Sequence, residues 1–411
     1  MMITATQTDH DQRDNRPAWR RLAFGVVIGT IGSVGMWSFV VALSAVQASF
    51  GISRAEAVLP YAMSMGGFAF GGVVMGRLCD RLGLVTPLLI GAICLGTGYI
   101  GSSLATHVLI YALMQALVGF GASASFVPIM ADLSHWFVKY RGIAVAIASC
   151  GNYLAGTIWP PLLHRGIEHL GWRDTHLITG LVCLATLVPL AGLMRTKLAA
   201  RTSANLQEDQ DAPASNMSER LLLILLVIAG FACCVAMSMP QVHIVAYCAD
   251  LGYGPARGAE MLSIMLGLGV ISRLTSGLIA DKIGGLRTLL IGSGLQGVAL
   301  LLYFFYDDLV SLYVISGLFG LFQGGIVPMY AVITREYFPA SRVGSLVGII
   351  IMATLIGMAA GGWMSGFIFD MTGQYRMAFL NGLAWNFVNI AICVTLIIRA
   401  AKPRLQLGSA R

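Results

Sequence analysis

Charged residues are scarce in this chain of 411 residues. Asp, Glu, Lys and Arg together make up 11% of it, whereas hydrophobic residues make up 57%. Because a soluble domain carries about 25% charged residues, this composition excludes an ordinary soluble globular fold. The 49 glycines are instead typical of an integral membrane protein built from many glycine-bearing helices.

Several chemical motifs are also missing from the sequence. It has no P-loop that would bind ATP and no basic patch interleaved with aromatic residues, so the net charge of +7 does not indicate nucleic acid as a partner. The eight cysteines lie in or beside apolar segments without metal-ligand spacing, which favours packing over disulfides or a metal site. No Ser/His/Asp cluster lies in the apolar segments, so we expect neither an enzyme nor a cofactor.

Long apolar segments are abundant by contrast. A helix needs about 20 apolar residues to cross roughly 30 Å of hydrocarbon. The segments that meet this requirement, six in each half, are residues 22–46, 57–79, 84–104, 108–132, 142–163, 175–194, 220–248, 258–280, 286–305, 309–333, 343–368 and 376–399.

One long hydrophilic stretch, residues 195–219, separates the two sets of six. Its Ser, Ala, Asn and acidic residues have no core to join, so it is expected to be a surface loop. The sequence thus predicts an all-α membrane protein of twelve transmembrane helices in two six-helix bundles. The expected order is an N-terminal tail (1–21), a first bundle (22–194), a linker (195–219), a second bundle (220–399) and a C-terminal tail (400–411).

The distribution of basic residues gives the orientation. With an inside N-terminus, all but six of the 26 Lys and Arg residues fall in inner segments. Arg273 lies inside an apolar run, and the outer ones are Arg54, Arg165, Arg173, Arg257 and Arg376. By the positive-inside rule, both termini are therefore expected in the cytoplasm.

A turn motif recurs in the two halves. It reads Gly-x-x-x-Asp-base-x-Gly after the second apolar segment of each half, and Val127-Pro128 in the fourth segment likewise recurs as Val327-Pro328 in the tenth. The leading glycine would let a neighbouring helix approach, and the Asp–base pair could latch the inner face shut. Ordinary polar turns are the alternative. The motif residues are Gly76, Asp80 and Arg81, then Gly277, Asp281 and Lys282.

Arg273 is the candidate site residue that stands out. An arginine at membrane depth costs about 2.5–3.5 kcal/mol on insertion scales, and intramembrane ionisable residues are functional by default. We expect it to hold an anion. The alternative is a structural arginine bonded to backbone carbonyls or to a neighbouring carboxylate.

The chain resembles the major facilitator superfamily, whose signature loops have the form of these paired turn motifs. The resemblance spans about residues 20–400. The resemblance implies two pseudo-symmetric bundles that rock around a central cavity. A finer resemblance is to bacterial monocarboxylate transporters. It is carried by the stretch from His135 to Ala144, by Pro240-Gln241-Val242-His243, Tyr247 and Asp250-Leu251-Gly252, and by the arginine at 273. In that family, and in the related oxalate–formate exchangers, this arginine is taken to bind the substrate carboxylate. A bacterial inner-membrane location follows from the same resemblance.

The sequence departs from this family at charged positions. Animal monocarboxylate transporters carry an Asp one turn before the arginine, where this chain has Gly269, and a lysine in the first helix, where residues 22–50 hold no charge. Oxalate exchangers place a lysine in helix eleven, and residues 343–369 have none. Because an unpaired buried charge is costly, a single buried cation favours a monoanion over a dianion.

Five further residues are candidates for contact with substrate. His243 could carry a proton, since its unperturbed pKa lies near 6.5, or donate a hydrogen bond; alternatively it bonds a carbonyl freed by Pro240. Bundle packing is the alternative for the other four. They are Phe126, Asn152, Gln323 and Tyr330. His176, near an outer helix end, is expected to be solvated.

Together these features predict a secondary transporter for a small, lactate- or pyruvate-like monocarboxylate, coupled to a proton and functional as a monomer in the lipid bilayer. Alternatives are an organic anion exchanger of the oxalate/formate type, or a drug or sugar carrier of the same superfamily. Helix five reads SCGNYLAGTIWPP and lacks the Gly-Pro motif of the drug exporters. A membrane enzyme or nutrient sensor is the alternative from another class.

Overall fold

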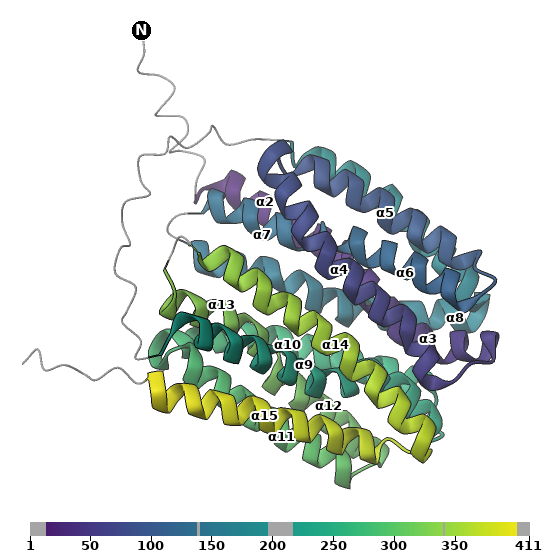
Figure 1. Cartoon of the computed structure of the whole chain (residues 1–411). Helices are drawn as coiled ribbons and strands as arrows, with labels where there is room; N and C mark the ends of the chain where they lie inside the picture. The colour runs from purple at the N-terminus through teal and green to yellow at the C-terminus, as the bar shows by residue number, and fades with distance from the viewer. Residues whose placement is uncertain (1–13, 138–139, 196–216, 340–341, 401–411) are drawn as a thin grey trace, which may run out of the picture.

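The computed structural model describes residues 14–137, 140–195, 217–339 and 342–400, and all regular structure within these ranges is α-helical (Figure 1). This agrees with the expected all-α class. Most of the expected linker and parts of both expected tails lie outside the described residues.

The described part of the first half contains seven helices. They are α2 (Arg16–Gly32), α3 (Val34–Phe50), α4 (Arg54–Leu82), α5 (Val85–Ser103), α6 (Val108–Ser123), α7 (Val127–Trp136) and α8 (Arg141–Leu193). Another seven lie in the residues that the structure describes in the second half. They are α9 (Glu219–Asp250), α10 (Pro255–Ile283), α11 (Gly285–Phe305), α12 (Leu309–Gln323), α13 (Ile326–Tyr337), α14 (Val343–Thr372) and α15 (Arg376–Ala400).

These helices provide the twelve expected membrane crossings. Eleven described spans are long and apolar enough to cross a membrane. One of them, residues 143–193 in α8, is two crossings, because Gly171 interrupts the helix with a φ of +82°, a conformation that favours glycine.

Three crossings are broken inside the membrane region. The first is α2 followed by α3, with Ser33 between them, and the fourth is α6 followed by α7, with residues 124–126 between them. The tenth is α12 followed by α13, broken at Gly324-Gly325. The repeated Val-Pro pairs lie in the first turns of α7 and α13, where proline is tolerated because those N–H groups have no helical partner.

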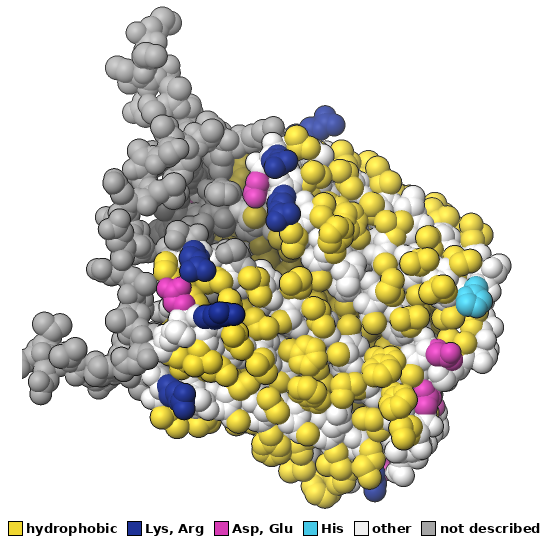
Figure 2. Space-filling view, in the orientation of Figure 1, with side chains coloured by type: hydrophobic (Ala, Val, Ile, Leu, Met, Phe, Trp, Pro, Cys, Tyr) yellow, Lys and Arg dark blue, Asp and Glu magenta, His cyan; other side chains and the backbone are white. Residues whose placement is uncertain are grey.

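The outer surface has the character of a membrane protein. In Figure 2 apolar side chains cover the visible face, whereas charged side chains gather toward its two ends. The end where α2 begins and α15 ends is called the terminal end below, and the opposite one the far end (Figure 1). The chain is therefore an integral, multi-pass membrane protein.

The two halves meet along a few helix pairs. Across the boundary α4 packs on α14, α8 on α10, and α3 on α9. In Figure 2 the surface is hollowed between the halves toward the terminal end. Within the first half, His176 is 1% exposed and contacts the Tyr111 hydroxyl at 3.0 Å. The expectation that His176 is solvated is therefore wrong, because an aromatic cluster encloses it.

Each half contains a close helix seam built on a glycine. A Cβ atom at Gly119 in α6 would lie 1.9 Å from the Ser64 carbonyl oxygen of α4. A Cβ atom at Gly320 in α12 would lie 1.9 Å from the Met265 carbonyl oxygen of α10. Both seams join the second and fourth crossings of a half, so the duplication seen in the turn motifs also appears in the packing.

We predict that Gly119→Ala and Gly320→Ala each destabilise the protein. The new methyl group would meet a backbone carbonyl that cannot move without its helix, and overpacking costs about 1–3 kcal/mol. Thermal unfolding in detergent measures the effect. Gly294→Ala in α11 is the matched control, because a Cβ atom there meets nothing within 4 Å. Equal unfolding temperatures for all three variants would contradict the seam assignment.

Candidate functional site

Arg273 lies in α10, buried between the two halves, with 9% of its surface exposed. Its Nη1 donates to the Ser149 carbonyl of α8 at 2.9 Å, and its Nε donates to the Gly324 carbonyl at 3.3 Å. The Gly324 carbonyl is accessible to it because the tenth crossing is broken there. The arginine therefore bonds to backbone acceptors of both halves, which is the contact type expected in its structural alternative.

The charge of Arg273 has no acidic partner among the described residues. Its Cζ lies 3.8 Å from the ring centroid of Tyr153, so the guanidinium rests on an aromatic face. No described residue accepts a hydrogen bond from its Nη2, and this atom is not among the fully enclosed unpartnered ones. Nη2 thus remains available to a ligand, and a cation without a counter-charge favours an anion there.

Tyr153 and Gln323 add neutral polar groups beside this cation. The Tyr153 hydroxyl donates to Gln323 Oε1 at 3.4 Å, and Gln323 Nε2 is buried without a partner. A Cβ atom at Gly269 would lie 2.4 Å from the Tyr153 ring. The absence of the family's aspartate at 269 therefore has a packing reason here: the tyrosine ring fills the space that its side chain would need.

Asn152 and Phe126 lie on neighbouring elements of the first half. Asn152 in α8 accepts a hydrogen bond from Trp37 Nε1 at its side-chain oxygen, at 3.0 Å. Phe126 lies in the break before α7, with its ring 6.1 Å from that of Phe68. The amide of Asn152 thus holds Trp37 in this structure.

Tyr330 belongs to a different polar network inside the second half. Its hydroxyl donates to Asn389 Oδ1 at 3.3 Å, and Asn389 Nδ2 in turn donates to Ser293 Oγ at 2.7 Å. The Tyr330 hydroxyl is therefore bonded to α15, and no described hydrogen bond joins it to Arg273 or Tyr153.

His243 lies near the far end of α9, fully buried. Its Nε2 donates to the Gly362 carbonyl of α14 at 2.8 Å, because a carbonyl can only accept, and its Nδ1 pairs with the Tyr375 hydroxyl at 3.1 Å. A neutral imidazole satisfies both contacts, with Nδ1 accepting. The carbonyl partner comes from another helix and not from the turn before Pro240. The structure does not bring His243 into contact with Arg273.

The turn motifs lie at the terminal end. Asp80 and Arg81 are exposed, as are Asp281 and Lys282, and none of these four has a hydrogen-bond or ion-pair partner among the described residues. Nothing within 4 Å would meet a Cβ atom at Gly277. The motif residues therefore form no latch between described residues in this structure.

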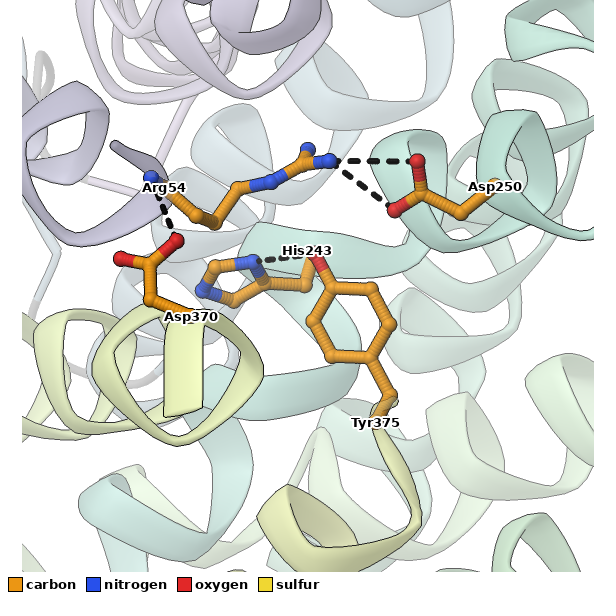
Figure 3. A network of polar contacts seen from close by, with 5 residues as sticks. All are labelled: Arg54, His243, Asp250, Asp370 and Tyr375. Carbon is orange, nitrogen blue, oxygen red and sulfur yellow. Dashed lines mark hydrogen bonds and ion pairs between the residues drawn. The ribbon is translucent and has the colours of Figure 1, made fainter. Parts of the chain in front are cut away.

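Polar contacts at the far end join the halves instead. Arg54, at the start of α4, donates through Nη2 to Asp250 Oδ2 at 2.9 Å, and Asp370 of α14 accepts the Arg54 backbone N–H at 2.8 Å (Figure 3). The far end is thus closed. Arg54 was counted among the outer bases and Asp250 belongs to a stretch quoted for the family resemblance, but their pairing and the role of Asp370 were not predicted. Opposite charges at helix ends were the available signal.

The chain is similar to a known family of membrane transporters. The family model described as "Major Facilitator Superfamily" matches residues 25–310 and 261–410. "Monocarboxylate transporter 13" of Bos taurus is 26% identical over 341 residues, covering 80% of this chain and 77% of the relative. "Uncharacterized MFS-type transporter YcxA" of Bacillus subtilis is 25% identical over 334 residues, covering 79% and 81%.

A solved structure shares the fold. The bacterial homologue of the human lysosomal transporter Spinster, in an inward-facing and occupied conformation, superposes with a TM-score of 0.74 at 14% identity. The match covers 96% of this chain and 100% of that one. Relatives and fold are those of transporters, not of enzymes.

Proposed function

The chain belongs to the Major Facilitator Superfamily, as its paired turn motifs predicted, and on that premise we propose that it carries a small monocarboxylate anion together with a proton. Several relatives are named monocarboxylate transporters, which supports an organic anion as the substrate. The single observation that carries the proposal is Arg273, a buried cation between the halves without an acidic partner among the described residues.

The contacts of Arg273 suit a carboxylate. A guanidinium presents five N–H donors in a planar fork, and Nε and Nη1 bond to neutral carbonyls while Nη2 is free of described acceptors. A carboxylate would supply the missing negative charge, and charge-assisted hydrogen bonds are about twice as strong as neutral ones. The Gln323 Nε2 group, buried without a partner, could bond a second oxygen of the substrate.

Charge balance favours a monoanion. Arg273 is the only one of the 26 Lys and Arg residues that the expected topology does not place near a membrane surface. A second negative charge on the substrate would therefore remain unpaired, at a high desolvation cost. Lactate- or pyruvate-like acids therefore fit better than oxalate. A thermal-shift screen of lactate, pyruvate, short fatty acids, oxalate and formate identifies the acid.

The position of the site between the halves fits alternating access. Arg273 bonds to Ser149 of the first half while its own helix belongs to the second. Rocking of the halves would change that contact, and it would alternately open the site to each side of the membrane. We propose a monomeric carrier in a bacterial inner membrane, with both termini in the cytoplasm.

The proton carrier is proposed from the same geometry. His243 is neutral in its present contacts with Gly362 and Tyr375, which belong to its own half. An imidazole that gains access to water titrates near pH 6.5, so His243, close to the far end, is the candidate to take up a proton in the open state. An organic anion exchanger of the oxalate/formate type is the second candidate function, and it needs no proton carrier.

We predict that Arg273→Ala abolishes transport of the acid found in the screen. Loss of a hydrogen bond to a charged group costs about 1.5–3 kcal/mol, which corresponds to roughly 10- to 150-fold in affinity. Arg273→Lys should also be poor, because a point charge lacks the planar fork. Binding and uptake in proteoliposomes measure both. Arg287→Ala, at an exposed arginine of α11, is the control for net charge. Normal transport by Arg273→Ala protein that folds would refute the anion site.

We also predict that uptake is driven by protons. An inward proton gradient should accelerate uptake, addition of the acid should drive measurable proton entry into the vesicles, and a protonophore should remove the stimulation. The measurement is uptake of labelled acid together with an internal pH dye. Uptake that ignores the protonophore but rises with internal substrate would favour exchange.

A further inference from the structure

The far-end contacts between the halves are one-sided in charge. The cation, Arg54, lies on the first half, and both acids that bind it, Asp250 and Asp370, lie on the second. Figure 3 shows these three residues with His243 and Tyr375, which complete the network. Opening of the far end must therefore separate Arg54 from both acids at once.

Asp370 binds the helix and not the guanidinium. Its two carboxylate oxygens accept the backbone N–H groups of Arg54 and Ala55 at 2.8 and 2.7 Å. The N-terminus of a helix carries unpaired N–H groups and a partial positive charge, which an acid stabilises. Asp370 thus neutralises the end of α4 and leaves the Arg54 side chain to Asp250.

Some N–H donors of the Arg54 side chain have no hydrogen-bond partner while the far end is closed. It is 6% exposed, and only its Nη2 bonds to Asp250, at 3.2 and 2.9 Å. Nε and Nη1 are enclosed and have no hydrogen-bond partner. One face of the guanidinium lies 4.9 Å from the Phe369 ring. Unpaired buried donors are costly, so this arginine would gain from a carboxylate that meets more of its N–H groups.

No described acid of the first half contacts the Arg54 side chain, whose ion-pair partner, Asp250, lies on the second half. Glu56, the acidic residue nearest in sequence, accepts hydrogen bonds from the backbone and hydroxyl of Ser53 in the capping box of α4. In the open state Arg54 would therefore be a cation at the mouth of the central cavity, on the side from which a substrate anion arrives.

We propose that Arg54 is a second carboxylate-binding site, which captures the monocarboxylate substrate at the far end, and that Asp250 occupies this site when the far end closes. The inference rests on the proposed function, since the ligand is the same class of anion. The side chain of Asp250 ends in the group that such a substrate carries, so the two compete for one guanidinium. Closure then delivers the released anion toward Arg273.

The experiment measures transport from each side separately. Oriented proteoliposomes are given labelled lactate or pyruvate, whichever the wild-type protein transports, from the far side or from the terminal side. For entry from the far side, Arg54→Gln should raise KM by about tenfold or more, because charged hydrogen bonds are lost. Asp250→Asn should lower that KM, because the competitor is weakened, and should also lower Vmax, because closure is less favourable. Neither variant should change KM for entry from the terminal side.

The two variants distinguish capture from a purely structural latch. If Arg54 only holds the far end closed, Arg54→Gln and Asp250→Asn break the same contact and shift KM in the same direction; that result would overturn the proposal. Arg257→Gln is the matched control, an exposed arginine near the far-end start of α10 that pairs with Glu260 at 3.1 Å. It should leave both KM values unchanged, and a rise equal to that of Arg54→Gln would show a general surface-charge effect instead.

Failures of folding and of the proposed function are separable. Should Arg54→Gln not fold, Arg54→Lys keeps the charge without the fork and should raise KM from the far side by a smaller factor, while Asp250→Asn tests competition by itself. If the wild-type protein transports none of the acids, the proposed function fails. If it does transport one, and Arg273→Ala is inactive while Arg54→Gln and Arg54→Lys leave KM unchanged, the capture site alone is refuted.

Discussion

Backbone hydrogen bonding in the absence of water is the constraint on which this structure depends. A bilayer offers no partner to a free N–H or C=O group, so each crossing must be helical, and each break must be compensated by protein. Three crossings are nevertheless broken inside the membrane region. At Gly324-Gly325 the compensation is visible: Arg273 takes the Gly324 carbonyl, and Ser272 Oγ accepts the Gly325 N–H at 3.1 Å. The break in the tenth crossing thus frees a carbonyl for Arg273, and Arg273 in turn satisfies that carbonyl.

The two halves repeat the same packing, but only the second half carries a buried charge, Arg273, at the repeated position. The glycine seams and the turn motifs repeat in both halves, yet Gly72 stands before the first turn motif where Arg273 stands before the second. The far end has the reverse asymmetry, with Arg54 on the first half and its acids on the second. Each half therefore contributes one buried arginine, at different depths, to the boundary between them. The two halves thus share their fold but differ in where their buried charges lie.

Sequence reasoning reached the fold and the principal candidate residue. Twelve crossings followed from apolar length, and the repeat of Gly76 as Gly277 identified the duplication. Arg273 was found because a charge inside an apolar run needs a partner. Its partners could not be found, since Ser149 and Gly324 contribute backbone carbonyls, which every residue has. For the pairing of Arg54 with Asp250 the sequence offered only opposite charges at helix ends, and which ends meet depends on how the two halves pack.

The glycine seams have a mechanical consequence. Where Gly119 lies on Ser64, and Gly320 on Met265, two helices touch backbone to backbone, with no side chain to yield between them. Such contacts make the packing of the second crossing on the fourth stiff in each half. A rigid half cannot absorb a local displacement. Separation of the two halves at one end of their boundary therefore also moves them relative to each other at the opposite end. Arg273, which bonds to carbonyls of both halves, lies on the boundary that such a separation would displace.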